Sequence, residues 1–595
     1  MKRIQHVIVG IFLLMLWMAG QMSTPNLNRP TALGGDTSFT PVVDGTKAPE
    51  HAPEQPDVSD VAQKVAGRSD RQHLDNWTVL VYLSADNNLD NFAFEVINDL
   101  ESVGPTPAVN VIVFVDYLSY PVSGARCYNI TFDADLTQIN SPIIYTLSEP
   151  NMGDPETLED FIFLGQYYAP AQRYLLIFSD HGHSFQSVCS DYTNFDRLTP
   201  DEIATALSNS SLEYIDVVAF EACLMQHLEV VYELRDLTDY VVASEEWMSL
   251  NGFPHEDWLA DLVADPDTSP LELSEILVDR YLEAYGPGGR YYSDSMTFPT
   301  ISAVDTNAID TVAQRLDDLT TALLPESNLQ TYFESLCIAR AATQSYVVPF
   351  YTDLGDFAAE TILSATEHLH IATLAQHLQH DVDQSVIFEG HFSGVRDSTG
   401  LGFGFTTYGS LPLALLADTQ WDEFMSAFCA IGETPATAPL LRANYGVRHG
   451  YLDGKTDEFY FLFTPTSAGT FTFRIESAWG IDEDLDFYLY DAGMNELVSS
   501  ATTDTSTEVI SYYIGLFFPF FPPTYILKVV SSNYGSIIYG KAVVRFSVVH
   551  LSLAVILFDL YIYIILFLLA GYILVFFVIF RYYRLSKIRP RPDPS

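Results

Sequence analysis

Short apolar runs alternate with longer helix-like segments from residue 77 to about residue 260. Runs of strand length, rich in β-branched and aromatic residues, lie at 79–83, 109–117, 174–178 and 215–220. The segments between them have helical length, and one opens on Thr199-x-x-Glu202, a capping-box pattern. Strands that alternate with helices form parallel sheets with helices on both faces. The pattern therefore predicts an α/β fold with a doubly wound, mostly parallel sheet.

The chain is long enough to need more than one domain. It has 595 residues, whereas a single hydrophobic core rarely serves more than about 250 to 300. We assign residues 73–435 to the α/β unit, including a more helical extension after residue 260. Residues 441–548 change to alternating strands separated by Gly, Asn and Asp, which predicts an all-β sandwich. Residues 22–72 are rich in Pro, Ser, Thr, Asp and Gly, and predict a disordered stalk or propeptide.

Both ends of the chain carry apolar segments. Residues 1–21 have two basic residues followed by an apolar run and small residues, which indicates a secretory signal peptide; an uncleaved anchor is the alternative. Residues 556–580 predict a transmembrane helix, since residues 560–580 are uncharged and long enough to cross a bilayer. The tail, 581–595, is basic and is expected in the cytoplasm. We therefore expect a single-pass protein of the cell membrane with its domains outside the cell.

Charge and cysteine content narrow the class of protein. The chain has 28 Lys and Arg against 77 Asp and Glu, a formal net charge of -49. Nucleic-acid binding needs a positive surface, so this excess of acid argues against it and favours cationic partners. There are five cysteines. Outside the cell, an odd number leaves at least one thiol unpaired unless it bonds to another chain.

Polar residues follow the apolar run 174–178 at its carboxyl end. The run is followed by Ser179-Asp180-His181-Gly182-His183. Residues two apart in a strand face the same side, so His181 and His183 are candidate zinc ligands, although no nearby Cys or His supplies a third. A second histidine-rich stretch has helical spacing and predicts a solvated helix face; it holds His368, His370, His377 and His380.

The alternative to a zinc site is a site in which a cysteine is the nucleophile. The apolar run 215–220 is followed by Glu221, Ala222 and Cys223. The carboxyl ends of parallel strands meet at one edge of a sheet, so the fold can place His181 beside Cys223. A thiolate is a strong nucleophile, and an imidazole can protonate the leaving amine. Gly182 would let its N–H approach a developing oxyanion. The alternative is that Cys223 is a buried core thiol.

Six ordered blocks of the sequence resemble the clostripain family of cysteine peptidases, which share the caspase-like fold. The blocks lie at 77–90, 151–162, 173–185, 198–207, 220–247 and 252–254, and weaker similarity continues to about residue 430. The resemblance implies a cysteine endopeptidase acting on peptide or protein substrates, with His181 as the catalytic histidine and Cys223 as the nucleophile. It also implies that the amides of Gly182 and Cys223 form the oxyanion hole. The sequence departs from the family at His183-Ser184-Phe185, where a Gly-rich stretch ending in Trp is common.

The resemblance further implies cleavage after a basic residue. The family has Asp where this chain has Glu221, two positions before Cys223 and on the same side of an extended strand. A carboxylate there favours Arg over Lys, because Arg binds it in bidentate fashion. The loop 243–254 offers Glu245 and Glu246 as second acids. The alternative is that Glu221 caps a backbone amide.

The remaining inferences concern the sandwich and the cofactor. Residues 441–548 resemble pre-peptidase C-terminal domains, which implies a noncatalytic module that spaces the enzyme from the membrane. A rival reading is a surface adhesion or receptor protein that binds through the sandwich and has lost peptidase activity. No cofactor is certain; calcium is a candidate by resemblance to clostripain, and the acidic stretch 482–486 offers oxygen ligands for it.

We expect protease treatment of intact cells to remove residues from about 22 to 548 and to spare a tag at the C-terminus. The expected orientation puts everything between the two apolar ends outside the cell. Immunoblots against an ectodomain epitope and against the tag measure the two products. Recovery of the α/β unit from the cytosolic fraction would contradict this orientation.

Overall fold

The computed structural model describes residues 75–119, 124–212, 214–293, 295, 297–347, 350–431, 440–442, 447–452, 458–465, 469–477, 485–500, 507–514, 524–531 and 542–550. The predicted signal peptide, the stalk or propeptide and the apolar segment 556–580 lie outside these residues, as does most of the acidic stretch 482–486. Within the described ranges, no helix combines the length and the apolar character that a membrane span requires.

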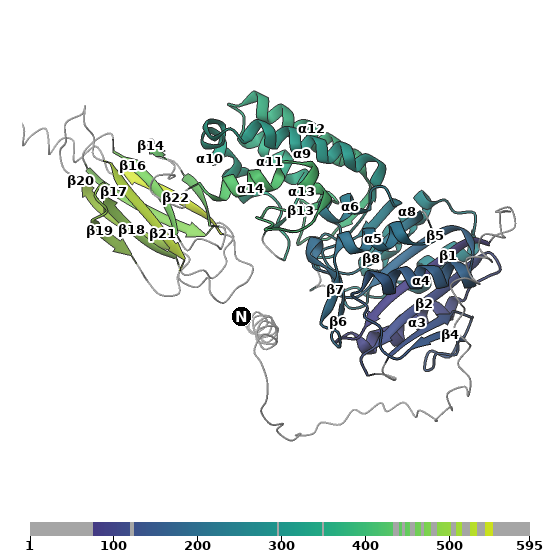
Figure 1. Cartoon of the computed structure of the whole chain (residues 1–595). Coiled ribbons are helices and arrows are strands. Elements are labelled where there is room, and N and C mark those ends of the chain that lie inside the picture. The colour runs from purple at the N-terminus through teal and green to yellow at the C-terminus, as the bar shows by residue number, and fades with distance from the viewer. Residues whose placement is uncertain are drawn as a thin grey trace, which may run out of the picture. The chain divides into compact units, whose positions relative to one another are not determined.

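A mixed sheet of nine strands forms the centre of the α/β region (Figure 1). The strand order is β12-β10-β9-β8-β5-β1-β2-β3-β4. The five inner strands, from β9 to β2, pair in parallel, while the outer pairs on each side are antiparallel. The strands are β1 (Asp75–Ala85), β2 (Val109–Tyr117), β3 (Gly124–Asn129), β4 (Ile143–Leu147), β5 (Ala171–Ser179), β8 (Ile215–Glu221), β9 (Thr238–Ala243), β10 (Thr300–Asp305) and β12 (Val386–His391). The prediction of a mostly parallel α/β sheet is confirmed.

Helices cover both faces of this sheet, because its inner strands are apolar on both sides. In β1, Val79 and Val81 belong to one buried apolar cluster, and Leu80 and Tyr82 belong to the other. Such two-sided burial is typical of parallel sheets. The first cluster includes residues of α3 (Asp90–Val103), α7 (His255–Ala264) and α8 (Pro270–Tyr285). The second includes residues of α4 (Pro155–Tyr168), α5 (Pro200–Asn209) and α6 (Leu228–Leu234).

Local sequence signals set some of the helix boundaries. Helix α5 begins at Pro200, and the Glu202 carboxylate accepts a hydrogen bond from the N–H of Thr199 at 2.9 Å. The capping box predicted from these two residues is therefore present.

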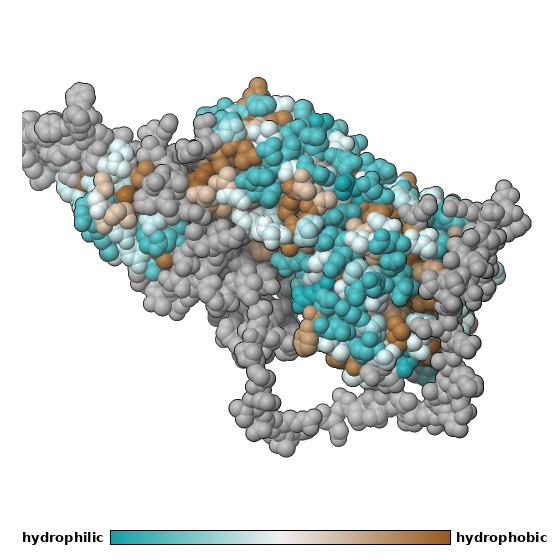
Figure 2. Space-filling model, viewed as in Figure 1, coloured by the Kyte–Doolittle hydropathy of each residue, from teal (hydrophilic) through white to brown (hydrophobic). Residues whose placement is uncertain are grey.

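Hydrophilic residues cover most of the α/β surface that Figure 2 shows.

The predicted helical extension follows β10. Its helices are η3 (Thr306–Ala308), α9 (Ile309–Leu323), α10 (Glu326–Ala342), α11 (Leu354–Ser364), α12 (Leu369–Ser385), α13 (Ala414–Asp418) and α14 (Trp421–Cys429), and β11 (Tyr351–Asp353) pairs with β13 (Gly402–Gly404). Three of the four clustered histidines lie exposed on α12, at 370, 377 and 380, as the helical spacing predicted.

Between β5 and α5 lie η2 (Ser184–Gln186) and the hairpin of β6 (Val188–Asp191) and β7 (Asp196–Leu198).

A separate all-β region follows the helices. Its first sheet contains β14 (Leu440–Arg442), β16 (Glu458–Thr464), β18 (Leu485–Asp491), β19 (Glu496–Ser500) and β21 (Tyr525–Ser531). The second contains β15 (Val447–Leu452), β17 (Gly469–Ser477), β20 (Thr507–Ile514) and β22 (Ala542–His550). Phe463 of the first sheet contacts Phe471 of the second, with ring centroids 5.2 Å apart. The two sheets therefore share an aromatic core.

All five cysteines lie in the described α/β and helical regions, and none forms a disulfide. Four are buried, and only Cys223 is half-buried. It is thus the thiol with the greatest access to solvent.

Candidate active site

The register of two adjacent strands brings His181 and Cys223 to the same edge of the sheet. Strands β5 and β8 pair in parallel, with Ser179 opposite Glu221. His181 and Cys223 each lie two residues beyond this pair. Both side chains line one cavity, with a volume of about 130 Å³, at the carboxyl ends of β1, β5 and β8.

The chain leaves β8 through a strained turn. Leu224, directly after Cys223, has a φ of 64°, in the left-handed region that non-glycine residues rarely adopt. Its N–H donates to the carbonyl of Glu246 at 3.0 Å, which holds the turn. The turn leaves Cys223 half-buried at the rim of the sheet, where it packs against the apolar core.

The Cys223 side chain rests as a thiol. Burial raises its pKa to about 11, although the N–H of Met248, 3.3 Å from the sulfur, favours the thiolate. Only a small fraction of the side chain is therefore ionised at neutral pH. A neighbouring base must remove the proton before or during an attack on a substrate.

His181 is suited to be that base. Burial and the charge of Arg197 lower its pKa, so the imidazole is neutral at pH 7. Its Nε2 lies 3.0 Å from Oδ1 of Asn88, which also accepts a hydrogen bond from the Tyr192 hydroxyl at 2.9 Å. Because an amide oxygen only accepts, this contact favours the tautomer with the hydrogen on Nε2 and a lone pair on Nδ1.

Asn88 was not among the residues predicted for the site. It lies three residues after the end of β1, the parallel neighbour of β5. The signal that identifies it is a polar Asn87-Asn88 pair after a buried strand, by the same rule that identified His181.

Gly182 and Cys223 approach each other closely. A Cβ on Gly182 would lie 2.2 Å from the carbonyl oxygen of Cys223 and 3.0 Å from Cβ of Ala222. The two strand exits can therefore lie this close only with glycine at position 182. No described carbonyl accepts a hydrogen bond from the N–H of either Gly182 or Cys223, although the Cys223 N–H interacts with its own sulfur.

Glu221 lines the cavity and is also buried in an ion pair. Its Oε1 accepts hydrogen bonds from the N–H of Phe253 at 2.6 Å and from Nε2 of His255 at 3.1 Å. Burial opposes its charge, but His255, Ser179 and the Phe253 amide outweigh burial and lower its pKa. Burial likewise opposes a charge on His255, and Glu221 outweighs it and raises the pKa of His255. Glu221 therefore binds a backbone amide, as the alternative interpretation of this residue predicted.

Glu245 and Glu246 do not line this cavity; both are buried against the helical extension. Oε1 of Glu245 accepts from the Tyr346 hydroxyl at 3.1 Å and from the N–H of Gly400 at 3.0 Å. The Glu246 carboxylate accepts from the N–H of Val347 at 2.7 Å. These contacts hold distant loops together, and they do not form the pocket wall expected from the sequence.

A different acid, Asp99 of α3, takes part in the cavity. It is half-buried, and burial raises its pKa to about 6 although the charge of His255 lowers it. The lining also includes Glu95, Asp180 and Glu221, and it contains no lysine or arginine among the described residues. Nothing in the strand pattern pointed to Asp99, because α3 reaches the cavity through the tertiary fold.

The zinc reading of His181 and His183 finds no support in the ligand geometry. Burial lowers the pKa of His183 to about 4, and its Nδ1 is buried without a partner. In the described part of the chain, three or more metal-type side chains converge at one place, a carboxylate cluster that includes neither histidine.

A thiol and a neutral imidazole that share a cavity after two parallel strands are the arrangement typical of thiol hydrolases. The sequence profile of the clostripain family matches residues 81–425, more than half of the chain. The chain belongs to the clostripain family, a family of cysteine peptidases.

Known proteins show the following similarity. Clostripain from Hathewaya histolytica is 30% identical over 233 residues, which cover 33% of this chain and 43% of that protein. A secreted C11 cysteine protease from Bacteroides thetaiotaomicron, solved with an irreversible peptide inhibitor, is 21% identical with a TM-score of 0.45, over 60% of this chain and 99% of that one. The pre-peptidase C-terminal domain of a collagenase from Bacillus anthracis is 16% identical with a TM-score of 0.14, over 18% of this chain and 89% of that domain.

We expect Glu221→Gln to lower the free energy of unfolding by about 3 kcal/mol near pH 5.5, because it breaks a buried ion pair. The lowered pKa of Glu221 gives stability that is lost as the pH falls, and the raised pKa of His255 gives stability that is lost as the pH rises. The loss caused by the substitution should therefore be smaller at pH 9, because His255 loses its proton as the pH rises. Denaturant unfolding at both pH values measures it, with the exposed Glu275→Gln as control. An equal loss at both values would contradict the ion pair.

Proposed function

We propose that the chain is an endopeptidase that cleaves peptide bonds through Cys223 and His181. The observation that carries this proposal is the meeting of a half-buried thiol and a neutral imidazole at one cavity on adjacent parallel strands. Membership of a cysteine peptidase family supports it.

The reaction follows from the protonation states. His181 Nδ1 takes the thiol proton while the sulfur of Cys223 attacks the substrate carbonyl carbon. The N–H groups of Gly182 and Cys223 donate to the oxyanion that forms. The intermediate then collapses, the C–N bond breaks, and the leaving amine takes the proton from His181. Water, deprotonated by the same imidazole, hydrolyses the thioester and restores the thiol.

Asn88 keeps the imidazole in the required tautomer. As the acceptor for Nε2–H it leaves Nδ1 free, and it becomes a better partner when the ring is charged during the reaction. It is therefore a positioning residue, held in turn by Tyr192.

We further propose that the cavity accepts a basic side chain, Arg in preference to Lys. The carboxylates that line it support this preference, and its described lining contains no Lys or Arg. His255 also lines the cavity, but it is paired with Glu221. Asp99 provides the most accessible charge, because the carboxylate of Glu221 already receives His255 and the Phe253 amide. Glu221 contributes from beneath the cavity. Arg gains over Lys through two parallel hydrogen bonds to one carboxylate.

We also propose that the enzyme is anchored in the cell membrane by residues 556–580, with the peptidase outside the cell. The apolar, uncharged sequence and its basic flank support this location. The β-sheet region between peptidase and membrane then acts as a spacer. The protease-treatment experiment described above tests the orientation.

The catalytic pair is tested by substitution. Cys223→Ala should abolish hydrolysis, and His181→Ala should lower kcat by roughly 10²- to 10⁴-fold, the usual contribution of a general acid–base. His183→Ala should have a much smaller effect. Labelling with a peptidyl acyloxymethyl ketone ending in Arg, followed by mass spectrometry, should modify Cys223. Equal losses for both histidine variants, together with inhibition by the zinc chelator 1,10-phenanthroline, would favour a zinc hydrolase. A wild-type chain that is folded but never labelled would favour the adhesion or receptor reading.

Specificity is tested with fluorogenic peptides that differ only before the cut bond. Asp99→Asn should lower the ratio of kcat/KM for Arg over Leu by about 10-fold or more, the loss expected for a charge-assisted contact. Glu95→Gln is the matched control and should change the ratio less, since Glu95 is exposed. Glu221→Gln should also lower the ratio.

The same ratio should fall as the pH drops below about 6, because Asp99 then becomes protonated. Taking the ratio cancels the titration of the catalytic pair, which affects both substrates. Faster cleavage after Leu than after Arg by the wild-type enzyme would reject a basic specificity altogether.

A further inference from the structure

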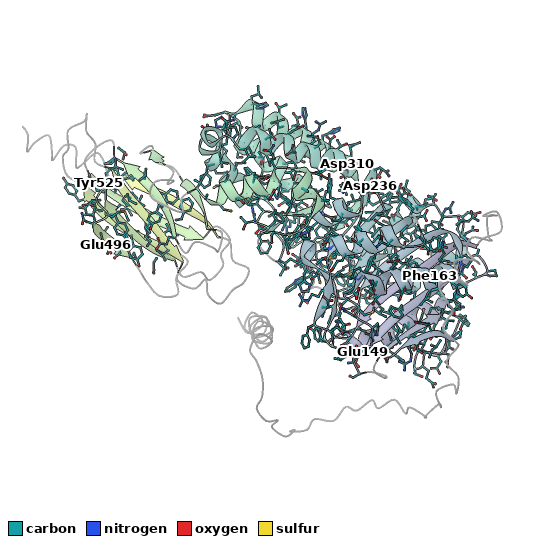
Figure 3. The ribbon with its side chains drawn as sticks, in the orientation of Figure 1. Glu149, Phe163, Asp236, Asp310, Glu496 and Tyr525 are labelled. Atoms are coloured by element: carbon teal, nitrogen blue, oxygen red, sulfur yellow. The ribbon has the colours of Figure 1, made fainter. Side chains whose placement is uncertain are left out.

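Four carboxylates converge beside the active site without taking part in it. One oxygen from each lies within 4.8 Å of the others. The residues are Asp86, directly after β1; Asp116, in β2; Glu149, after β4; and Asp191, at the end of β6. In β1 and β2, Ser84 lies opposite Asp116, so two adjacent parallel strands deliver two of the acids to one edge. Figure 3 labels Glu149 in the part of the molecule where Figure 1 shows β6 and α3.

Two of these acids are buried with no counterion. Asp86 and Asp116 are 0% exposed, and all four of their carboxylate oxygens lack a hydrogen-bond partner of normal geometry among the described residues. The Tyr117 amide still favours a charge on Asp116, and the Glu149 carboxyl lies close enough to Asp86 to share a hydrogen bond with it. Asp191 is buried and bound by the N–H of Met152 at 2.9 Å and the N–H of Asn194 at 2.7 Å. A buried charge without a partner is strongly unfavourable.

Electrostatic repulsion within the cluster is correspondingly strong. Burial, followed by the charges of Glu149, Asp86 and Asp191, raises the pKa of Asp116 to about 8. Burial and the neighbouring acids also raise the pKa of Glu149 to about 7. The largest charge effects on both groups thus come from the other carboxylates of the cluster.

The size and chemistry of the cluster fit a calcium ion. Ca²⁺ prefers carboxylate and carbonyl oxygens at about 2.3 to 2.6 Å, so two ligands on opposite sides of the ion are about 4.8 Å apart. No two of the four ligand atoms are more than 4.8 Å apart, so one ion can contact all of them. The one exposed member, Glu149, leaves a route for the ion and for water ligands. Mg²⁺ suits the cluster less, because it requires a tighter octahedron.

We propose that Asp86, Asp116, Glu149 and Asp191 bind one Ca²⁺ ion, and that this ion fixes the loops that position His181. Asp86 directly precedes Asn87 and Asn88, and Asp191 directly precedes Tyr192. The N–H of Tyr192 donates to the carbonyl of Asp86 at 2.8 Å. The ion therefore joins the two segments that supply Asn88 and the hydroxyl that holds it.

This site differs from the acidic stretch 482–486 considered from the sequence. The binding part of the proposal is independent of peptidase activity, whereas the link to His181 rests on the proposed function. The binding experiment therefore uses the full chain in detergent with Cys223→Ala, so that failure of the peptidase proposal cannot affect its outcome.

Calorimetric titration of this chelator-treated protein with CaCl₂ should show one site, and saturating Ca²⁺ should raise Tm by about 5 °C or more. Asp116→Asn should abolish the heat of binding and the Tm shift. In EGTA the same variant should unfold at a temperature no lower than that of the parent, because the substitution removes one carboxylate from a crowded cluster. Substitution of a merely structural aspartate would instead lower the unfolding temperature. Glu149→Gln, at an exposed position, should fold in any case and weaken Ca²⁺ binding at least 10-fold.

Asp486→Asn is the control and should leave both readouts unchanged. Retained binding in both Asp116→Asn and Glu149→Gln, or loss of binding in Asp486→Asn, would overturn the site. The link to catalysis is measured in protein that retains Cys223. EGTA should slow labelling by the acyloxymethyl ketone, and CaCl₂ should restore it. Labelling at the same rate with and without Ca²⁺, in protein that binds the ion, would overturn the link alone.

Discussion

The parallel pairing of β5 with β8 is the constraint on which the candidate site depends. Ser179 lies opposite Glu221, so the next residues leave the sheet at the same level and carry His181 and Cys223 to one cavity. A slip of one residue would reverse the side on which each buried residue points. The side chains of β5 and β8 are buried in apolar clusters on both faces of the sheet, so a slip in register would disrupt both clusters.

Much of this arrangement is readable from the sequence, because it depends on local periodicity. Apolar runs of strand length, separated by helices, specify a parallel sheet, and polar residues after those runs mark its functional edge. His181 and Cys223 were selected as candidates in this way, and the structure brings both to one cavity. Asn88 also follows a buried strand at this edge, but it was not predicted. An amide side chain does not indicate a particular chemistry until its partner is known.

Side-chain partners that are distant in sequence could not be predicted. Strand alternation gives the side on which Glu221 points, but its pairing with His255 joins residues 34 positions apart. Glu245 was expected in a pocket wall, yet it meets Gly400, 155 positions away. Asp99 enters the cavity because α3 packs beside β1. In each case the environment of a carboxylate is set by tertiary contacts, which periodicity does not encode.

The resting state of Cys223 bears on how long the protein survives. Oxidants and disulfides react with thiolates far faster than with thiols. With a pKa of about 11, only about one molecule in 10⁴ carries the anion at pH 7. In the proposed mechanism, a nucleophile stored in protonated form is spared irreversible oxidation between encounters with peptides. It becomes reactive only when His181 takes the proton, so the burial that slows ionisation also protects the sulfur.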